Sequence, residues 1–516
     1  MKHQKLLCVV LFFLSLAACT SLRAQSPATE KASHPPSAAV AAPLMVELHS
    51  TNSPLISFRI LLHAGSINDP KGKEGLNALT ALMIGQGGTK DMTYKQIVDA
   101  LYPWAASISP QSDKEVTVFI ANIHRDNLQK FYRIFANLLL QPRFDESDFK
   151  RNKDELLNYL QNTLRFNDDE DLGKQSLEAM IYANHPYGHT PEGTVDGLKS
   201  ITLDDVKAYY KKVYTRDNIT LGIAGGYTPE FVRGMKADFA KLPPGKVAAV
   251  TLPKPAPIKD LQIDVVKKEN RATALSFGCP VDVTRADKDF YALMVASSYL
   301  GEHRTQNGVL FNYIRGLRGL NYGDYAYIEN FIQDGGSTFP VPNIPRRHQF
   351  FSVWIRPVEP QNAHFALRAA LFQVQQLVAK GLTKEQFEQQ RRFLLNYSKL
   401  WNQTLSRRLG TLLDSKFYGI DYFPDRVDRE LKALKVEDVN AAIKKHLQDK
   451  NFDVTIITRD AEPLKTALAE NTPSPIQYAG PVSDEVLRDD KVLVGLKLNV
   501  NPDKLRVVPA SELFEK

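Results

Sequence analysis

Apolar positions between residues 44 and 461 follow two periods, and the same order of periods occurs twice. Continuous apolar runs at 55–65 (LISFRILLHAG) and 273–281 (TALSFGCPV) predict buried strands. Each is followed by stretches with apolar residues three and four apart, which predict helices. Each series closes in another apolar run, at 218–226 (NITLGIAGG) or 451–459 (NFDVTIITR). Strands beside runs of helices, without regular β-α-β alternation, favour an α+β fold with mostly antiparallel sheets.

The repeated order is accompanied by repeated sequence. Residues 149–159 (FKRNKDELLNY) match 387–397 (FEQQRRFLLNY) at an offset of 238 residues. Residues 204–212 (DDVKAYYKK) match 437–445 (EDVNAAIKK) at an offset of 233 residues. Amphipathic helices can resemble each other by chance, but two matched blocks in the same order favour duplication. We therefore expect two duplicated halves, each a sheet packed with helices, in a clamshell-like arrangement.

Composition marks the boundaries between these parts. Residues 241–260 (KLPPGKVAAVTLPKPAPIKD) are rich in Pro and Lys and predict an interdomain linker. The first half is then 44–245 and the second half 258–461. A C-terminal extension, 462–516, contains Pro-punctuated turns and short predicted strands such as 490–498 (DKVLVGLKL). We expect the extension to pack along the surface of the second half.

The N-terminus has the features of a secretory signal. Basic residues precede an apolar run at 6–16 that is too short to span a bilayer, which predicts a signal peptide over 1–18. Cys19 follows Leu-Ala-Ala and resembles the lipidated residue of a bacterial lipobox. Ordinary cleavage after Ala18 or Ala24 is the alternative. Residues 19–43 are rich in Pro, Ser and Ala and predict a flexible tether.

These features predict a protein of the bacterial periplasm that is held at a membrane by a single lipid anchor. Thr20 after the lipidated position, where Asp would direct retention in the inner membrane, favours the outer membrane. A soluble periplasmic product is the alternative. Only Cys279 remains beyond the signal and the lipidated Cys19, so a disulfide framework is excluded. The net charge of +7 is spread along the chain without a Lys/Arg-rich run, which argues against nucleic-acid binding.

The chain resembles the pitrilysin/insulinase family of inverzincin zinc peptidases over most of residues 44–460. Six segments carry the resemblance. None is decisive alone, but the order and spacing of the six together are specific. The segments are HAGSINDPKGKEGL (63–76), GGT (87–89), QPRFDESDF (141–149), HPYG (185–188), TLDDVKAYYKKVYTRDNITLGIAGG (202–226) and GVLFNYIRGLRGLNYGDYAY (308–327).

Active members of that family carry H-x-x-E-H on a helix, where the two His hold zinc and the Glu activates water. The resemblance places these positions in GLNALTALMIGQGGT (75–89), at Ala78, Ala81 and Leu82. None of the three side chains can bind a metal or transfer a proton. Leu76, Leu79 and Met83 are still expected to give the helix a core-facing side.

The third zinc ligand of the family, a Glu, is expected near Asn158 or Tyr159. Glu155 is close in sequence but lies about one helical turn away. His185 and His189 are four residues apart, but the intervening Pro and Gly argue against a helix that could bring them to one metal. We therefore expect no cofactor in this chain.

The resemblance also implies a second feature. In two-subunit bacterial members one chain carries zinc, and the other carries an Arg/Tyr pair, seven residues apart, that holds the substrate. Arg315 and Tyr322 have this spacing, and Arg318 is a competing arginine. The alternative is that Arg315 makes a surface ion pair and Tyr322 fills a strand face.

The resemblance thus implies the non-catalytic subunit of a heterodimeric zinc peptidase. The two subunits of such a peptidase enclose the substrate in a closed chamber. This chain would form half of that chamber and bind peptide or unfolded polypeptide, while a homologous zinc-bearing partner supplies the metal. A scaffold or peptide-binding protein with no peptidase role is the alternative. An enzyme of another class is disfavoured, because the sequence contains no nucleophile elbow, P-loop or dinucleotide fingerprint.

Overall fold

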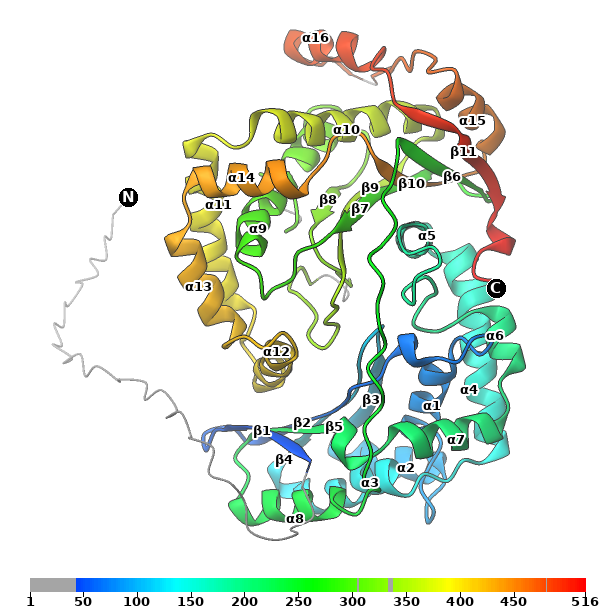
Figure 1. Cartoon of the computed structure of the whole chain (residues 1–516), viewed down its shortest axis with the longest axis vertical. Helices are drawn as coiled ribbons and strands as arrows, with labels where there is room; N and C mark the ends of the chain where they lie inside the picture. Colours follow the sequence, from blue (N-terminus) through cyan, green and yellow to red (C-terminus); the bar gives the residue numbers. More distant parts are fainter. Residues whose placement is uncertain (1–42, 304–305, 333–336, 479) are drawn as a thin grey trace, which may run out of the picture. The chain divides into compact units, whose positions relative to one another are not determined.

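The structure is a computed structural model that describes residues 43–303, 306–332, 337–478 and 480–516 (Figure 1). The predicted signal peptide (1–18), the lipidation site Cys19 and the tether up to residue 42 lie outside the described residues. In the described ranges, no helix has both the length and the apolar character needed to cross a bilayer.

The first half is built on a five-stranded sheet with the order β1-β5-β2-β4-β3. Only β1 and β5 pair in parallel, and the other neighbours are antiparallel. The strands are β1 (Leu44–His49), β2 (Leu55–Leu62), β3 (Ser107–Ser112), β4 (Thr117–His124) and β5 (Ile219–Gly225).

Alternate residues of each strand point to opposite faces of the sheet. Helices of the first half cover one of these faces. Phe58 of β2, for example, packs 5.4 Å from the ring of Phe135 on α3. The helices of the first half are α1 (Leu76–Gly85), α2 (Tyr94–Leu101), α3 (Leu128–Leu140), α4 (Glu146–Asn158), α5 (Asp169–Ile181), α6 (Val195–Ser200), α7 (Leu203–Val213) and α8 (Pro229–Phe239).

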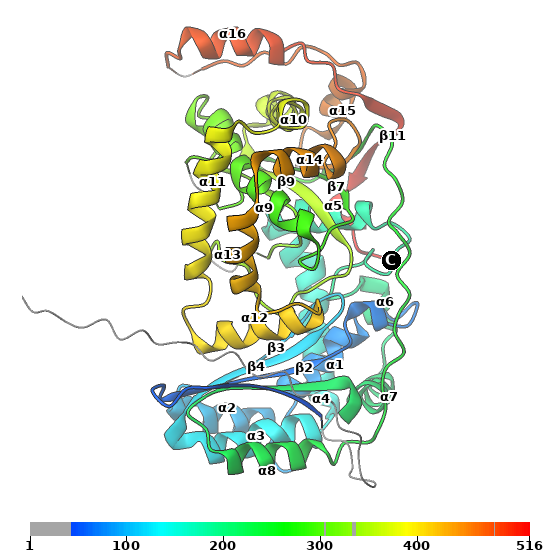
Figure 2. The same cartoon turned by 60° about the vertical axis from the view of Figure 1, so that its left-hand side comes forward.

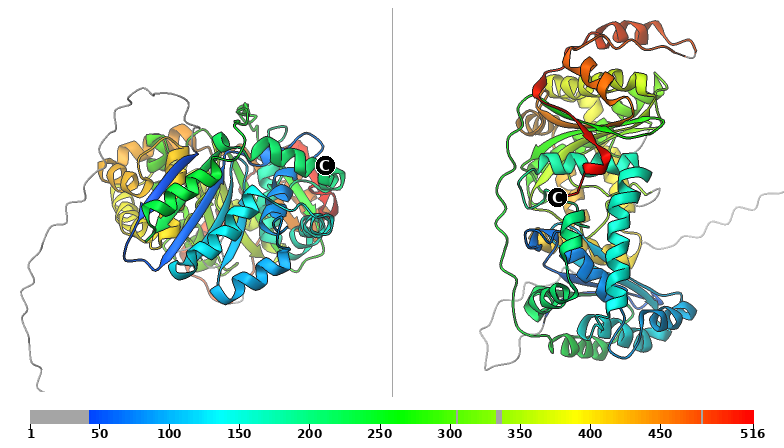
Figure 3. Two further views of the ribbon diagram at one scale, coloured as in Figure 1. Left: turned by 90° about the horizontal axis from the view of Figure 1, so that it is seen from below. Right: turned by 90° about the vertical axis from the view of Figure 1, so that its right-hand side faces the viewer.

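The second half repeats this plan with a six-stranded sheet of order β11-β6-β10-β7-β9-β8. The strands are β6 (Leu261–Lys267), β7 (Thr273–Val281), β8 (Asp324–Tyr327), β9 (Gln349–Val358), β10 (Phe452–Thr458) and β11 (Val500–Pro509). The helices are α9 (Lys288–Leu300), α10 (Ala363–Lys380), α11 (Lys384–Tyr397), α12 (Leu405–Phe417), α13 (Phe423–Ala433), α14 (Val436–His446), α15 (Ala461–Ala469) and α16 (Asp484–Leu493). The predicted α+β fold of two mostly antiparallel halves is confirmed. No helix or strand forms between 243 and 259, where the sequence predicts the linker, seen in green in Figure 3.

Each sheet also receives a helix from the other half. Helix α5 packs on β7, β9 and β10, and α12 packs on β1, β2 and β5 (Figure 2). In the second contact, Leu409 and Leu413 of α12 share a buried cluster with Val46 and Leu61. The two helices begin at residues 169 and 405, a separation close to the repeat offsets. The duplicated halves therefore interlock through equivalent helices.

The C-terminal extension differs from its prediction in two ways. The strand predicted at 490–498 is wrong, because Ser483 caps α16, which continues to Leu493, and strand β11 begins only at Val500. Of the apolar residues that suggested a strand, Leu493 is buried at the end of the helix and Val492 is exposed. The extension also reaches the first half, since the backbone N–H of Val195 donates to the carbonyl of Phe514 (2.9 Å).

Candidate functional site

The degenerate zinc helix α1 has a well-defined start. Gly75 precedes it with a φ of 104°, a conformation that favours glycine. The partly buried carboxyl group of Asp69 accepts hydrogen bonds from the backbone N–H groups of Gly75 (2.8 Å) and Asn77 (2.7 Å). These bonds satisfy donors that a helix N-terminus otherwise leaves open. The local structure of the helix is thus maintained without its zinc ligands.

The three motif positions on α1 are part of the hydrophobic core. Leu76, Leu79 and Met83 are buried as predicted, and Ala78 and Ala81 are buried with them. Leu82 is partly buried and packs against the same cluster. Because alkyl side chains occupy all three positions, the residues do not fit a zinc ion of the family's H-x-x-E-H type.

The expected third position also carries no ligand of the family type. Tyr159 opens a π-helical segment, Tyr159–Asn167, and its hydroxyl donates to Asp171 (3.1 Å). Burial raises the pKa of this hydroxyl well above its ordinary value, so it remains a neutral phenol. Glu155 is exposed on α4, and the Asn158 side chain accepts a hydrogen bond from Asn162 (2.8 Å). Across the described ranges, no three His, Cys, Asp or Glu side chains are grouped so that they could hold a metal.

His185 and His189 lie in turns, as the intervening Pro and Gly predict. The Nδ1 atom of His185 accepts from the N–H of Tyr187 (3.0 Å), and that of His189 contacts the carbonyl of Thr190 (2.9 Å). Burial lowers the pKa of each imidazole to about 4, so both are neutral at pH 7. Each ring is engaged by its own turn, and the geometry gives them a structural role.

Arg315 lies in a second π-helical segment, η6 (Phe311–Gly316). The N–H of Leu317 donates to the carbonyl of Asn312 (2.8 Å), which closes the wide turn. Gly319, with a φ of 65°, ends the segment by donating to the carbonyl of Arg315 (2.8 Å). π-helical turns are rare and frequently coincide with functional sites. The segments that hold Tyr159 and Arg315 are both of this type.

The structure brings Arg315 and Tyr322 together. The guanidinium carbon of Arg315 is 5.8 Å from the ring centre of Tyr322 and 5.3 Å from that of Phe311. These are cation–π distances, which hold the arginine loosely in place. Arg315 is partly buried and forms no ion pair within the described part of the chain, and 79% of Tyr322 is exposed. The strand-face alternative does not hold, because Tyr322 precedes β8 and projects outward.

The backbone around Tyr322 is fixed although its side chain is exposed. The Asn321 side chain donates to the carboxylate of Asp324 (2.7 Å) and to the carbonyl of Arg356 (3.0 Å). The N–H of Arg356 in turn donates to the carbonyl of Gly323 (3.1 Å). The exposed phenol of Tyr322 is therefore carried by a restrained backbone.

Arg318, the competing arginine, is a structural residue. Its side chain is fully buried, and its Nε atom donates to Asp490 on α16 (2.9 Å). One of its terminal nitrogens donates to the carbonyl of Tyr313 (2.8 Å), and its guanidinium lies 4.0 Å over the ring of Tyr313. The geometry therefore separates the two arginines. Arg315 is accessible to a ligand, and Arg318 is not.

Sequence reasoning missed a polar cavity of about 510 Å³ that includes Tyr159. Its wall contains Asp171, Glu192, Trp354 and Arg356, which come from both halves. Desolvation raises the pKa of Glu192 to about 7. The only sequence signal for Glu192 is its place shortly after the HPYG segment. Residues of the second half that complete the cavity are far away along the chain.

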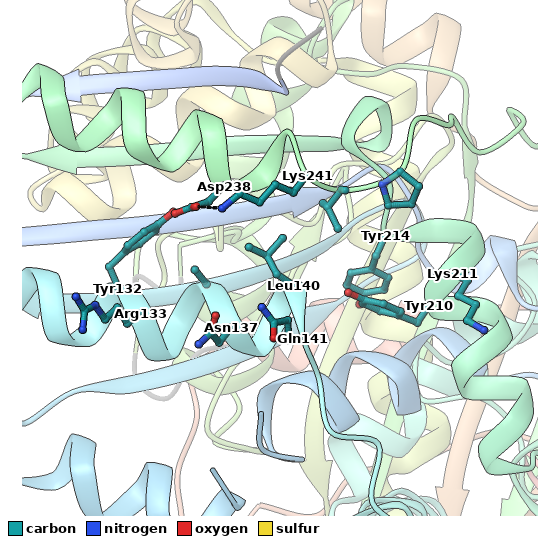
Figure 4. A pocket seen from close by; sticks show the side chains of 13 residues that line it. Tyr132, Arg133, Asn137, Leu140, Gln141, Tyr210, Lys211, Tyr214, Asp238 and Lys241 are labelled. Carbon is teal, nitrogen blue, oxygen red and sulfur yellow. Dashed lines mark hydrogen bonds and ion pairs between the residues drawn. The ribbon is translucent and has the colours of Figure 1, made fainter. Parts of the chain in front are cut away.

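A separate cavity of about 390 Å³ lies among α3, α7 and α8 (Figure 4). At one side, the hydroxyl of Tyr132 donates to Asp238 (3.1 Å), which also pairs with Lys241 (2.7 Å). At the other side, Tyr210 and Tyr214 stack with ring centres 4.9 Å apart. This cavity is on the helix-covered side of the first sheet, opposite the face that α12 covers, and no residue of the Arg315 segment lines it.

Comparison with known families agrees with the fold and with the altered zinc positions. Residues 44–194 match the model of the insulinase family (peptidase family M16), and residues 200–394 match that of the peptidase M16 inactive domain. Together the two models span more than half of the chain. A non-peptidase homolog, YmxG of Helicobacter pylori, is 22% identical over 397 residues, which cover 76% of this chain and 86% of that protein.

Solved structures share the fold. A peptidase M16 inactive domain from Pseudomonas fluorescens has a TM-score of 0.70 at 20% identity, covering 85% of this chain and 97% of that one. The periplasmic protease PqqL of Escherichia coli has a TM-score of 0.63 at 16% identity, covering 89% of this chain and 49% of that one. The predicted family is confirmed: the chain belongs to the M16 (insulinase) family and is related to its non-peptidase members.

Proposed function

We propose that this chain is the non-catalytic subunit of a two-chain zinc peptidase. It forms half of the chamber and binds peptide through Arg315 and Tyr322, while a homologous partner carries H-x-x-E-H and the zinc. The observation that carries the proposal is the pairing of Arg315, which is partly buried, with the exposed Tyr322, 5.8 Å from guanidinium to ring, on a chain with alkyl groups at all three zinc-motif positions.

The chemistry of the pair suits a peptide substrate. The guanidinium of Arg315 is a rigid fork of donors for peptide carbonyl oxygens. The phenol of Tyr322 can donate to the oxyanion that develops when water attacks the scissile carbonyl. Both groups act by binding and orienting the peptide, and neither activates the water. The substrate class is therefore short oligopeptides or unfolded polypeptide that reach the chamber in extended form.

The proposal places the complex in the periplasm, with this chain anchored to the outer membrane through lipidated Cys19. The signal-like residues 1–18 support it, and so does the likeness to a protease described as periplasmic, PqqL. The alternative is ordinary signal cleavage, which would release a soluble periplasmic protein without a lipid anchor.

The test is turnover of a quenched fluorescent oligopeptide by the chain reconstituted with its H-x-x-E-H homologue. Arg315→Ala and Tyr322→Phe are expected to reduce kcat/KM about a hundred-fold each, the effect of losing one contact to transition-state charge in a desolvated site. Arg271→Ala and Tyr102→Phe, which alter exposed residues elsewhere, serve as matched controls. Wild-type rates for both site variants, with the complex intact, would leave this chain a scaffold without a substrate role.

A further inference from the structure

The C-terminal extension returns to the segment that carries Arg315. The part of the chain that the two M16 family models match ends at residue 394, so α15, α16 and β11 lie beyond it. Helix α16 nevertheless contacts the π-helical segment η6 through its acidic side chains. The hydroxyl of Tyr313 contacts Asp489 at 3.5 Å, and the carboxylate of Asp490 accepts from Arg318.

The contact between α16 and Arg318, two residues after η6, is a buried charge pair. One oxygen of Asp490 accepts from Arg318 Nε (2.9 Å), and the other accepts from the hydroxyl of Tyr478 (2.6 Å). Arg318 also donates to the carbonyl of Tyr313, inside the π-helical turn (2.8 Å). A buried pair of this kind depends on both partners, since removal of one leaves the other charged group desolvated and unpaired.

Helix α16 is itself fixed to the second half at its C-terminal end, close to Asp490. Arg368 of α10 is fully buried and donates to the carbonyl of Val494 (2.7 Å), directly after the helix, and to that of Thr472 (3.0 Å), in the segment that follows α15. It also donates to the hydroxyl of Ser474 (2.8 Å). Asp490 is thus presented to Arg318 from a rigid position, which is the geometry required of a residue that orients another.

We infer that Asp490 is a positioning residue that acts through Arg318 to hold the segment 313–322 in the conformation that places Arg315 beside Tyr322. The inference rests on the proposed function for its significance, but its structural content concerns this chain alone. Without the carboxylate, the Arg318 guanidinium turns toward solvent and leaves the carbonyl of Tyr313 without its donor. The π-helical turn then loosens, and the Arg315–Tyr322 distance is no longer fixed.

The experiment is amide hydrogen exchange of the full chain, wild type against Asp490→Asn. Exchange in 311–323 is expected to accelerate about ten- to hundred-fold, as for loss of a hydrogen bond to a charged group, while exchange in β2 and β7 stays unchanged. Glu485→Gln, at an exposed position on the same helix, is the matched control. Tyr478→Phe, which removes only one hydrogen bond to Asp490, is the milder variant if Asp490→Asn does not fold.

Unchanged exchange in 311–323 overturns the inference, and so does acceleration spread evenly over the second half, which marks a general structural contact. In the reconstituted pair, Asp490→Asn is expected to lower kcat with little change in KM, and Asp490→Glu is expected to recover part of the rate. If exchange accelerates but the chain supports no peptidase activity, the positioning role of Asp490 stands and the proposed function is wrong. If Asp490→Asn shows normal exchange and turnover while Arg315→Ala is inactive, the proposed function stands and the positioning role is wrong.

Discussion

Arg346 of the second half pairs with Asp113 of the first at 2.8 Å, and both side chains are buried. The same guanidinium lies 2.8 Å from Glu178 on α5, and Glu178 is also 3.1 Å from Lys114. Burial raises the pKa of Glu178, but its two cationic neighbours outweigh this effect and hold the pKa below its ordinary value. The two halves are therefore joined by a buried charge cluster in addition to the interlocked helices.

Replacing Arg346 by Met is expected to destabilise the protein by about 3–5 kcal/mol, because Asp113 and Glu178 lose their shared buried counter-ion. The measurement is the urea midpoint at constant m-value. Arg429→Met is the control, since Arg429 pairs with Asp421 at the surface, where such a pair contributes about 1 kcal/mol or less. Equal midpoints for the two variants would show that the cluster does not stabilise the joined halves.

The free energy of unfolding is expected to depend on pH through Asp453. It is buried on β10 near Asp264, and burial together with that second carboxylate raises its pKa to about 7. The folded state therefore binds a proton more tightly than the unfolded state does. Its contribution to stability is fully present below about pH 4 and is lost as the pH rises toward 7.

Asp453→Asn cannot ionise, so it is expected to remove this decline and to be more stable than wild type above pH 7, by on the order of 1–3 kcal/mol. Urea midpoints of both proteins at pH 5 and pH 8 provide the measurement. Parallel pH profiles for wild type and variant would contradict the assignment of the decline to Asp453.

The zinc-motif positions predict that the isolated chain binds no stoichiometric zinc and cleaves no peptide. Ala78, Ala81 and Leu82 offer no donor atom, and the hydroxyl of Tyr159 is held by Asp171. Elemental analysis of the purified chain after dialysis against a weak chelator is the measurement. One tightly held zinc per chain would mean that a site exists elsewhere in the molecule.

The proposed lipid anchor predicts that membrane attachment depends on Cys19. Cys19→Ser is expected to move the protein from the membrane fraction to the soluble periplasmic fraction, because a single lipid is its only proposed attachment. Fractionation of cells that express either form measures this shift. An unchanged distribution would favour ordinary signal cleavage after Ala18 or Ala24.

Local patterns were sufficient to predict much of the fold. The apolar runs at 55–65 and 273–281 became β2 and β7, and the spacing within GLNALTALMIG identified α1. The expected strand at 490–498 was wrong, because three consecutive apolar residues near its start suit a strand as well as the buried side of a helix end. Periodicity does not separate the two over so short a run.

The features that sequence reasoning missed depend on contacts between distant residues. The family resemblance, with its seven-residue spacing, was sufficient to select Arg315 and Tyr322 as candidates. It could not predict the burial of Arg318, since its partner Asp490 is 172 positions away. The Arg346 cluster likewise combines residues 113, 178 and 346. No local periodicity signals which distant carboxylate a buried arginine meets.

We propose that this chain works as the metal-free half of a zinc peptidase. Purification of the native protein from the cells that produce it, under conditions that preserve complexes, tests this proposal. The subunits are then identified by mass spectrometry, and zinc is measured in the intact complex and in each separated subunit.

We expect an equimolar homologue that contains H-x-x-E-H, one zinc per pair, and all of that zinc in the homologue. Recovery of this chain without such a homologue, or with one zinc bound to this chain itself, would contradict it.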